Sequence, residues 1–279
     1  MLVYYHWRLI AVQVLLCLVC LESSWADSLV PRNKHSWGRF KPGSWRRVRV
    51  FSEDFDENGN VLSSSTKEAT STLLEVDDTT FTLHIEGSVQ VAGEKIPSEP
   101  QTVKQTFNGE EVGKEIPVNS IGKGVVEING ESIECEIRKM VTNGGASKKT
   151  TIIHFSDEQA PYILRRETTY HSTMESTKSA SSKVEVVALR MPFRILAETK
   201  TVSLVKIVNQ HSSGSTETIE AHSTDVPGGV VSHTSNEKDR NGRIIRRSRL
   251  ELVDFGIGSN DEPVRKRILE RLRSKSGRR

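Results

Sequence analysis

Apolar and polar residues alternate along part of the first half of the chain. From residue 79 to residue 92, the large apolar side chains, beginning with Phe81 and Leu83, occupy odd positions, and polar side chains occupy most even ones. Successive side chains of a strand point to opposite faces, so this period of two predicts a strand with one buried face and one wet face. Residues 199–210 and 217–224 show the same tendency, and no segment before residue 260 has a long helical period.

Five Asn-Gly pairs punctuate the chain, at 58–59, 108–109, 129–130, 143–144 and 241–242. Asn-Gly is favoured in type I′ hairpin turns, because both central residues take positive φ. The clearest predicted hairpin joins residues 125–128 to residues 131–137 through Asn129-Gly130. A second predicted hairpin joins residues 230–237 to residues 243–253.

An internal echo supports a fold made of hairpins. Residues 134–164 and 203–231 share the order strand, turn, strand, His-x-Ser/Thr-Asp, Pro, strand, and His154 matches His222 at a spacing of 68 residues. Chance similarity between Thr-rich strands is the alternative explanation. The pattern predicts an all-β fold over residues 27–259, a large curved antiparallel sheet or open half-barrel built from repeated hairpins. A two-layer sheet stays open as an alternative.

The N-terminus has the parts of a secretory signal peptide. Arg8 precedes an apolar run from Leu9 to Leu21, and Ser24 and Ala26 supply the small residues of a cleavage site. The run is shorter than the roughly 20 apolar residues that a membrane-spanning helix needs. We therefore expect residues 1–26 to be removed and the mature chain to be exported, either periplasmic or secreted. An uncleaved N-terminal anchor is the alternative.

Cleavage after Ala26 would leave one cysteine in the mature chain. Cys17 and Cys20 precede the cleavage point, and Cys135 follows it. An exported chain with a single cysteine forms no internal disulfide. Cys135 follows a series of alternating apolar residues, and no histidine signature surrounds it. We expect a buried, unreactive thiol.

Charge is unevenly distributed along the chain. The formal net charge of +3 combines +7 over residues 263–279 with −4 over residues 27–262. Three apolar residues recur at helical spacing after Pro263, which predicts a short basic helix over residues 260–279. Its candidate contacts with an anionic membrane surface or another partner are Arg265, Lys266, Arg267, Arg271 and Arg273. A solvated tail without a partner is the alternative.

Aromatic and basic residues are mixed near the start of the mature chain, where Trp37, Phe40 and Trp45 stand among five Lys and Arg residues. Such a mixture can stack on nucleic acid. An exported protein with a mildly acidic body argues against a nucleic-acid partner. We expect instead that the rings close one end of the sheet while the arginine stems cover its rim.

Patterns for catalysis or metal binding are weak. The histidines form no His-x-x-x-His or His-Glu-x-x-His pair, although His222, Asp225 and His233 could converge around Pro227. Solvent-facing histidines and acidic turn residues are the ordinary explanation. The sequence also lacks a Gly-x-Ser-x-Gly elbow and a phosphate-binding glycine loop. It therefore predicts no catalytic residue, no metal and no cofactor, and it favours a protein that is not an enzyme.

Three segments, at residues 131–135, 222–231 and 242–253, resemble uncharacterised exported bacterial β-rich proteins. Those proteins are similar in pattern to the open β-barrels of lipoprotein-carrier-like families. The resemblance implies a curved antiparallel sheet that cups an apolar ligand, but this chain lacks the clear covering helices.

The leading hypothesis is an exported, non-catalytic β-sheet binding protein for an apolar ligand or an envelope component. One alternative is a structural or adaptor protein of the cell envelope that contacts its partners through the basic tail. A hydrolase is the other alternative.

Overall fold

The computed structural model describes residues 29–107, 116–144, 147–172 and 180–258. These residues form one 3-10 helix, η1 (Arg32–Lys34), and thirteen strands. The strands are β1 (Trp45–Phe55), β2 (Val61–Val76), β3 (Thr80–Val91), β4 (Glu94–Thr106), β5 (Val118–Ile128), β6 (Glu131–Gly144), β7 (Ser147–Phe155), β8 (Ile163–Ser172), β9 (Ala180–Ile195), β10 (Glu198–His211), β11 (Gly214–His222), β12 (Val230–Asp239) and β13 (Ile244–Gly256). Within the described residues, no helix has the length and apolar composition needed to cross a membrane.

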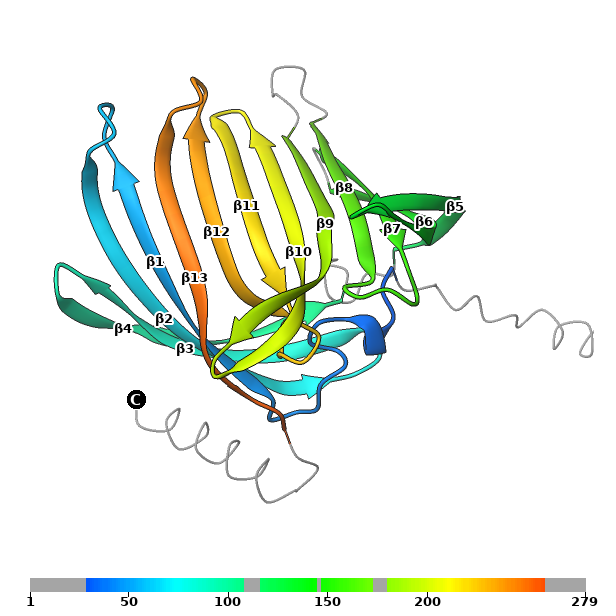
Figure 1. The fold of residues 1–279 in the computed structure, drawn as a ribbon, viewed down its shortest axis with the longest axis horizontal. Coiled ribbons are helices and arrows are strands. Elements are labelled where there is room, and N and C mark those ends of the chain that lie inside the picture. Colours follow the sequence, from blue (N-terminus) through cyan, green and yellow to red (C-terminus); the bar gives the residue numbers. More distant parts are fainter. Residues whose placement is uncertain (1–28, 108–115, 145–146, 173–179, 259–279) are drawn as a thin grey trace, which may run out of the picture.

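All thirteen strands belong to one sheet, in the order β4-β3-β2-β1-β13-β12-β11-β10-β9-β8-β7-β6-β5 (Figure 1). The chain starts in the middle, runs outward to β4, and continues from β5 at the other edge back to β13, which pairs antiparallel with β1. β4 and β5 do not pair, so the sheet stays open. The predicted all-β curved antiparallel sheet is confirmed, as one open sheet. The predicted helix over residues 260–279 lies outside the described residues.

Both predicted hairpins are confirmed. Asn129 and Gly130 join β5 to β6 with φ angles of 53° and 78°, the positive values that a type I′ turn requires. The turn between β12 and β13 contains Gly242, which has a φ of 80°. Turn chemistry between neighbouring strands is sufficient to locate these elements.

Two features differ from the sequence pattern. Residues 94–106 contain Pro97 and Pro100, yet they form β4. Proline lacks the N–H that an inner strand must donate, and β4 tolerates it because it is an edge strand. Asn143 and Gly144 end β6 and are not the turn itself, since Gly144 pairs with Ser147 and the connection falls at 145–146.

The two similar segments, residues 134–164 and 203–231, are related in the structure by an alignment one residue different from the alignment that the sequence suggested. Phe155 of β7 and His222 of β11 hold the equivalent last paired positions before their loops. Ser156 and Ser223 then close the two loops with the same backbone hydrogen bond, from their N–H to the carbonyl six residues on, at 2.8 Å in both cases. A shift of one residue reverses the face on which a strand side chain lies. His154 is therefore not the counterpart of His222, and it points to the opposite face of the sheet.

Residues 29–44, which we call the strap, precede β1 and cross one end of the sheet (Figure 1). The start of the strap packs on β6 and β7, in a cluster of Leu29, Val30, Met140, Ile153 and Phe155. The middle of the strap packs on β2 and β3, in a cluster of Trp37, Leu73, Phe81, Leu83 and Phe107, with Phe40 beside it. These strands lie near opposite edges of the sheet, so the strap links the two ends of the curl. The packing role expected for the early aromatic residues is confirmed for Trp37 and Phe40.

His35 fastens the strap to the sheet. Its Nδ1 accepts hydrogen bonds from the backbone N–H groups of Trp37 and Gly38, at 3.2 and 3.1 Å. Its ring lies 5.1 Å from the ring of Phe81 and 4.7 Å from the ring of Phe107. Burial lowers the pKa of His35 from 6.5 to about 4. A neutral ring is therefore part of the native packing.

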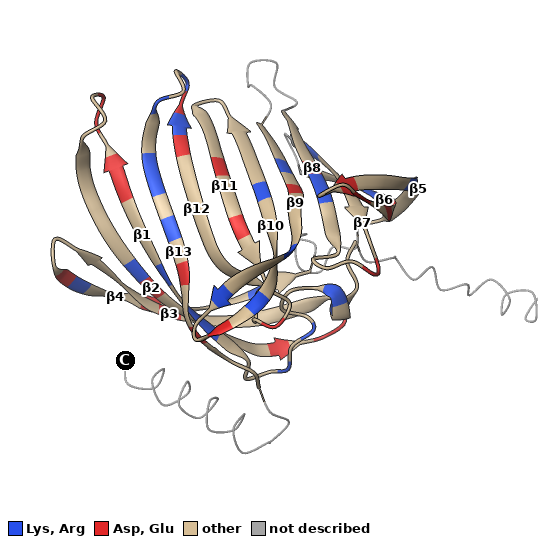
Figure 2. Cartoon of the chain, viewed as in Figure 1, with Lys and Arg blue, Asp and Glu red and all other residues tan. Residues whose placement is uncertain are grey.

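Charged residues of both signs are spread along the strands (Figure 2). Exposed ion pairs join neighbouring strands, among them Arg49 with Glu68 at 2.7 Å and Lys206 with Glu217 at 2.7 Å. Exposed pairs of this kind contribute about 0 to 1 kcal/mol each. They keep the surface soluble and add little to the stability of the curl, which depends on the strap.

We expect the stability of the fold to fall as the pH drops below 6.5. Between pH 6.5 and about 4, the unfolded chain binds a proton at His35 that the folded chain excludes. This difference lowers the free energy of unfolding by about 1.4 kcal/mol for each pH unit. In His35→Asn, the amide oxygen replaces the Nδ1 acceptor and does not titrate. Urea unfolding at pH 7 and pH 5 should therefore show a loss about 2 kcal/mol larger in the wild type than in the variant. Equal losses in the two proteins would contradict this role for His35.

Candidate functional site

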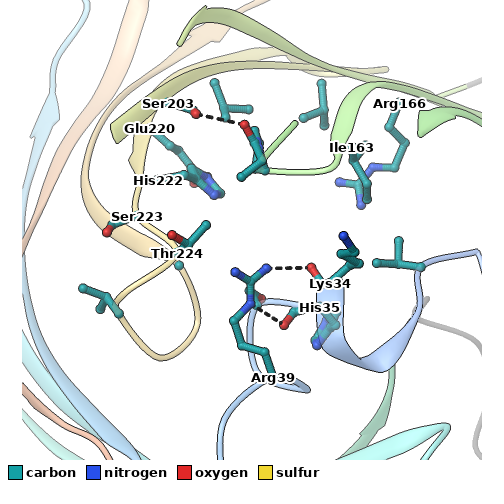
Figure 3. A pocket seen from close by; sticks show the side chains of 18 of the residues that line it. Lys34, His35, Arg39, Ile163, Arg166, Ser203, Glu220, His222, Ser223 and Thr224 are labelled. Atoms are coloured by element: carbon teal, nitrogen blue, oxygen red, sulfur yellow. Dashed lines mark hydrogen bonds and ion pairs between the residues drawn. The ribbon is translucent and has the colours of Figure 1, made fainter. Parts of the chain in front are cut away.

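A half-enclosed cavity of about 260 Å³ lies between the strap and the inner faces of β8 to β11. The loops at 156–162 and 223–229 complete its walls (Figure 3). Its apolar lining consists of Val30, Phe107, Ala160, Pro161, Ile163, Val184, Val205, Ile207 and Val226. Its charged and histidine side chains are Lys34, His35, Arg39, Arg166, Glu220 and His222. Three cations face one carboxylate, so the lining carries a net charge of +2 when the histidines are neutral.

The apolar wall of the cavity is built by β-branched residues at matched positions on neighbouring strands. Ile207 of β10 stands opposite Val184 of β9, and Val205 lies two residues before Ile207 on the same face. Residues two apart on a strand line the same face, so these three side chains form one continuous patch.

The concave wall beyond the cavity is polar. Residues that share the cavity face form a row of hydroxyl groups across five paired strands, namely Thr218, Ser235, Ser248, Ser52 and Ser65. The Thr218 hydroxyl donates a hydrogen bond to Ser235 at 2.8 Å. The cavity face therefore changes from the apolar patch at Val184, Val205 and Ile207 to a row of hydroxyl groups that begins at Thr218, opposite Ile207.

Two strap cations border the cavity, and both have partners. Lys34 Nζ donates to the carbonyl of Asp157 at 2.5 Å and lies 3.5 Å from its carboxylate. Arg39 donates to the carbonyls of Lys34 and His35, at 2.8 and 3.2 Å. Both cations lie over the ring of Tyr162, at 4.6 and 5.2 Å from its centre. These contacts tie the strap to the loop at 156–162 and hold two positive charges at the cavity.

Arg166 of β8 enters the cavity from the sheet side, opposite the strap (Figure 3). Its guanidinium makes no hydrogen bond or ion pair with any of the described residues. The side chain is open to water, and enough protein surrounds it that desolvation lowers the pKa of Arg166, against the attraction of Tyr170 and Glu220. The neighbouring Arg165 lies on the other face of β8 and donates to Glu167 at 3.0 Å. Two adjacent arginines thus differ in face and in partners.

One acid and two histidines meet beside the cavity. Glu220 Oε2 lies 2.6 Å from His222 Nε2, and Glu220 Oε1 lies 4.0 Å from His233 Nδ1. Burial alone would raise the pKa of Glu220, but the hydrogen bond with His222 and the nearby positive charge of Arg46 bring it below its ordinary value. Burial lowers the pKa of His233, and Glu220 opposes that effect. Glu220 is therefore a shared counter-charge for this cluster.

Arg46 of β1 lies behind the cluster. Its Nη1 donates to the carbonyl of Val230 at 3.3 Å, and its Nε is buried with no hydrogen-bond partner among the described residues. Desolvation lowers the pKa of Arg46, and the charge of Glu220 opposes this. The guanidinium lies 5.6 Å from the ring of Trp37, which places it against the strap.

The suggested convergence of His222 and His233 is present, but with a different acid. Asp225 is exposed and pairs with Lys200 at 3.4 Å, and Glu220 takes the position between the histidines. Glu220 and His222 are two residues apart on β11, so their side chains lie on the same face of the strand. The alternation of strand side chains therefore indicated that these two residues could pair. The position of Arg166 in the cavity depends on strand pairing and on the place of the strap, which no local sequence pattern indicates.

The Glu220–His222 pair lacks the contact with a nucleophile that covalent catalysis requires. No hydroxyl or thiol of the described residues lies within hydrogen-bond distance of His222. Cys135 Sγ lies 3.6 Å from Nδ1 of a different histidine, His154, but the thiol is buried, as expected, and burial raises its pKa. In the described part of the chain, no group of three or more His, Cys, Asp or Glu residues is placed to hold a metal ion. The five tail residues Arg265, Lys266, Arg267, Arg271 and Arg273 lie outside the described residues.

Replacing Glu220 tests its role as the shared counter-charge. Glu220→Gln removes the carboxylate that pairs with His222 and attracts Arg46, so we expect the free energy of unfolding to fall by about 1 to 3 kcal/mol. We also expect the pKa of His233 to fall further, because the attraction that opposes its burial is lost. Urea unfolding and NMR titration of the histidine ring protons measure these two effects.

Glu217→Gln is the matched control for this prediction. Glu217 lies on the opposite face of β11, where it pairs with Lys206 and Lys238 at 2.7 and 3.8 Å. Its loss should lower the free energy of unfolding by less than about 1 kcal/mol and leave His233 unchanged. Equal effects of the two substitutions would show that Glu220 has no special role.

No protein-family model matches the sequence, and no curated protein matches it. Two solved structures show a distant similarity. One is described as a "putative lipoprotein" from Parabacteroides distasonis, with 11% identity, a TM-score of 0.34, and coverage of 80% of this chain and 98% of the other. The second is described as a "putative exported protein" with a YmcC-like fold from Bacteroides fragilis, with 9% identity, a TM-score of 0.26, and coverage of 78% and 98%. Both descriptions are of the exported kind that the sequence resembled, but similarity at this level does not establish a shared function.

Proposed function

We propose that the mature chain, residues 27–279, is an exported, non-catalytic binding protein whose ligand lies in the cavity under the strap. The observation that carries the proposal is the composition of the cavity, an apolar wall faced by a few convergent charged groups. Small-molecule sites have this composition, because apolar contacts supply affinity and a few polar groups fix orientation. The signal-peptide pattern of residues 1–26 supports export.

The size of the cavity limits the enclosed part of the ligand. Its volume of about 260 Å³ falls just below the range of about 300 to 1,000 Å³ that holds drug-sized molecules. The hydroxyl-lined wall beyond it offers little apolar surface. We therefore infer that a ligand places a short apolar part against Val184, Val205 and Ile207, and that a longer molecule of the envelope extends along the polar wall.

The hydrolase alternative has less support than binding. His222 and Glu220 form an acid–histidine pair, but no nucleophile joins them among the described residues. The adaptor alternative depends on the basic tail, and the experiment below distinguishes it from a cavity ligand.

The direct test is native mass spectrometry of the chain, expressed in full and purified from an exporting host without detergent. We expect a mass that begins after Ala26, together with a bound apolar molecule at about one copy per chain, which solvent extraction releases. Ile207→Trp should fill the apolar wall and remove the ligand. Val208→Trp, on the opposite face of β10, should keep it.

A clean mass without ligand in the wild type, or equal retention by both variants, would overturn the cavity proposal. The tail would then be tested by comparing the envelope material that the chain retains with and without residues 260–279. Tail-dependent retention would favour the structural or adaptor function.

A further inference from the structure

Arg166 differs from the other cations of the cavity because it makes no hydrogen bond or ion pair with the residues that the structure describes. Lys34 and Arg39 are held by carbonyl groups and by the ring of Tyr162, and Arg165 is held by Glu167. Arg166 has no such contact with the described residues, although its backbone pairs with Ile153 of β7 and Val184 of β9. The Arg166 side chain is open to water, so its hydrogen-bond donors face solvent inside the cavity in place of a protein acceptor.

No carboxylate of the described residues forms an ion pair with Arg166. Glu220 lines the cavity and attracts Arg166, but its two oxygens face His222 and His233, and it also attracts Arg46. Lys34 and Arg39 add positive charge from the strap on the opposite side of the same space (Figure 3). The lining therefore attracts an anion of low charge, and Arg166 is the group with hydrogen-bond donors to spare.

The guanidinium also sits beside the apolar wall. Arg166 stands directly opposite Val184 on the neighbouring strand, and Val184 stands opposite Ile207. A molecule with an acid group at Arg166 thus meets a ridge of β-branched side chains on the adjacent strands. A planar guanidinium presents paired donors that match the two oxygens of a carboxylate or a phosphate.

We propose that Arg166 anchors an oxyanion, a carboxylate or a phosphate monoester, at the end of a ligand whose short alkyl part lies on Val184, Val205 and Ile207. This assignment rests on the proposed function and names the ligand class of that same cavity, an amphipathic acid. The strap cations Lys34 and Arg39 stabilise the bound anion through their charge and keep their own contacts. The source of the acid is either a free fatty acid or the head group of a lipid.

The test uses three eight-carbon probes, octanoate, octyl phosphate and octanol, titrated calorimetrically into the delipidated mature protein. The first two carry the two kinds of oxyanion, and octanol is the neutral match. We expect at least one anionic probe to bind about tenfold or more tightly than octanol, with an affinity that falls as salt is added. The stronger anionic probe indicates whether a carboxylate or a phosphate is the natural group, and mass spectrometry of the extracted material identifies its source.

Arg165 and Arg166 give a matched pair of variants. Arg166→Gln should weaken the anionic probe about tenfold to a hundredfold and leave octanol unchanged. Arg165→Gln removes the same charge from the outer face and should change neither probe. Arg166→Lys keeps the charge without the paired donors, and it should restore part of the lost affinity.

Each remaining outcome overturns the inference in a distinct way. If octanol and the anions bind equally, and Arg166→Gln changes nothing, the cavity holds apolar molecules and the acid group plays no part, so the proposed function stands without this anchor. If Arg165→Gln weakens anions as much as Arg166→Gln, the effect is one of overall charge. If no probe binds and native mass spectrometry finds no ligand, the proposed function falls as well.

Discussion

The contact between the strap and both ends of the sheet is the constraint on which the rest of the structure depends. A single open sheet has no ladder of hydrogen bonds to hold its edges near each other, and β4 and β5 do not pair. Residues 29–44 replace that ladder with side-chain packing, on β6 and β7 at one side and on β2 and β3 at the other. The hydrophobic burial of these side chains is the main favourable contribution to the free energy that holds the strap on the sheet. The cavity is the space that remains between the strap and the inner faces of β8 to β11.

The position of the strap also explains where the charged groups lie. Lys34 and Arg39 reach the cavity from the strap, and Arg46 lies behind it, against Trp37. Cations near an apolar wall require counter-charges or a bound anion, because desolvation disfavours an isolated charge. Glu220 meets that requirement for Arg46 and the histidines. Arg166 is open to water and makes no hydrogen bond or ion pair with the described residues, so its donors are available to a ligand.

Local sequence chemistry predicted much of the fold and little of the site. The turn at Asn129-Gly130 and the alternation in β3 depend on neighbouring residues, so the hairpins and strands could be located from them. The one-residue offset between His154 and His222 could not, because the loop-closing backbone hydrogen bonds of Ser156 and Ser223 set it, and these are not visible in the sequence. The choice of Glu220 over Asp225 follows from the strand face. The unpartnered state of Arg166 depends on a strap that is remote in sequence.

The pairing of β1 with β13 has a consequence for how the chain matures. Arg47 and Asp254 are in contact across a separation of 207 residues. Contacts between residues so far apart carry a large loop-closure entropy and slow the folding of β-rich chains. A chain threaded through an export channel from its N-terminus would deliver β1 first and β13 last, with β2 pairing to the other edge of β1. In that interval one edge of β1 would be open to other chains, and aggregation would compete with folding.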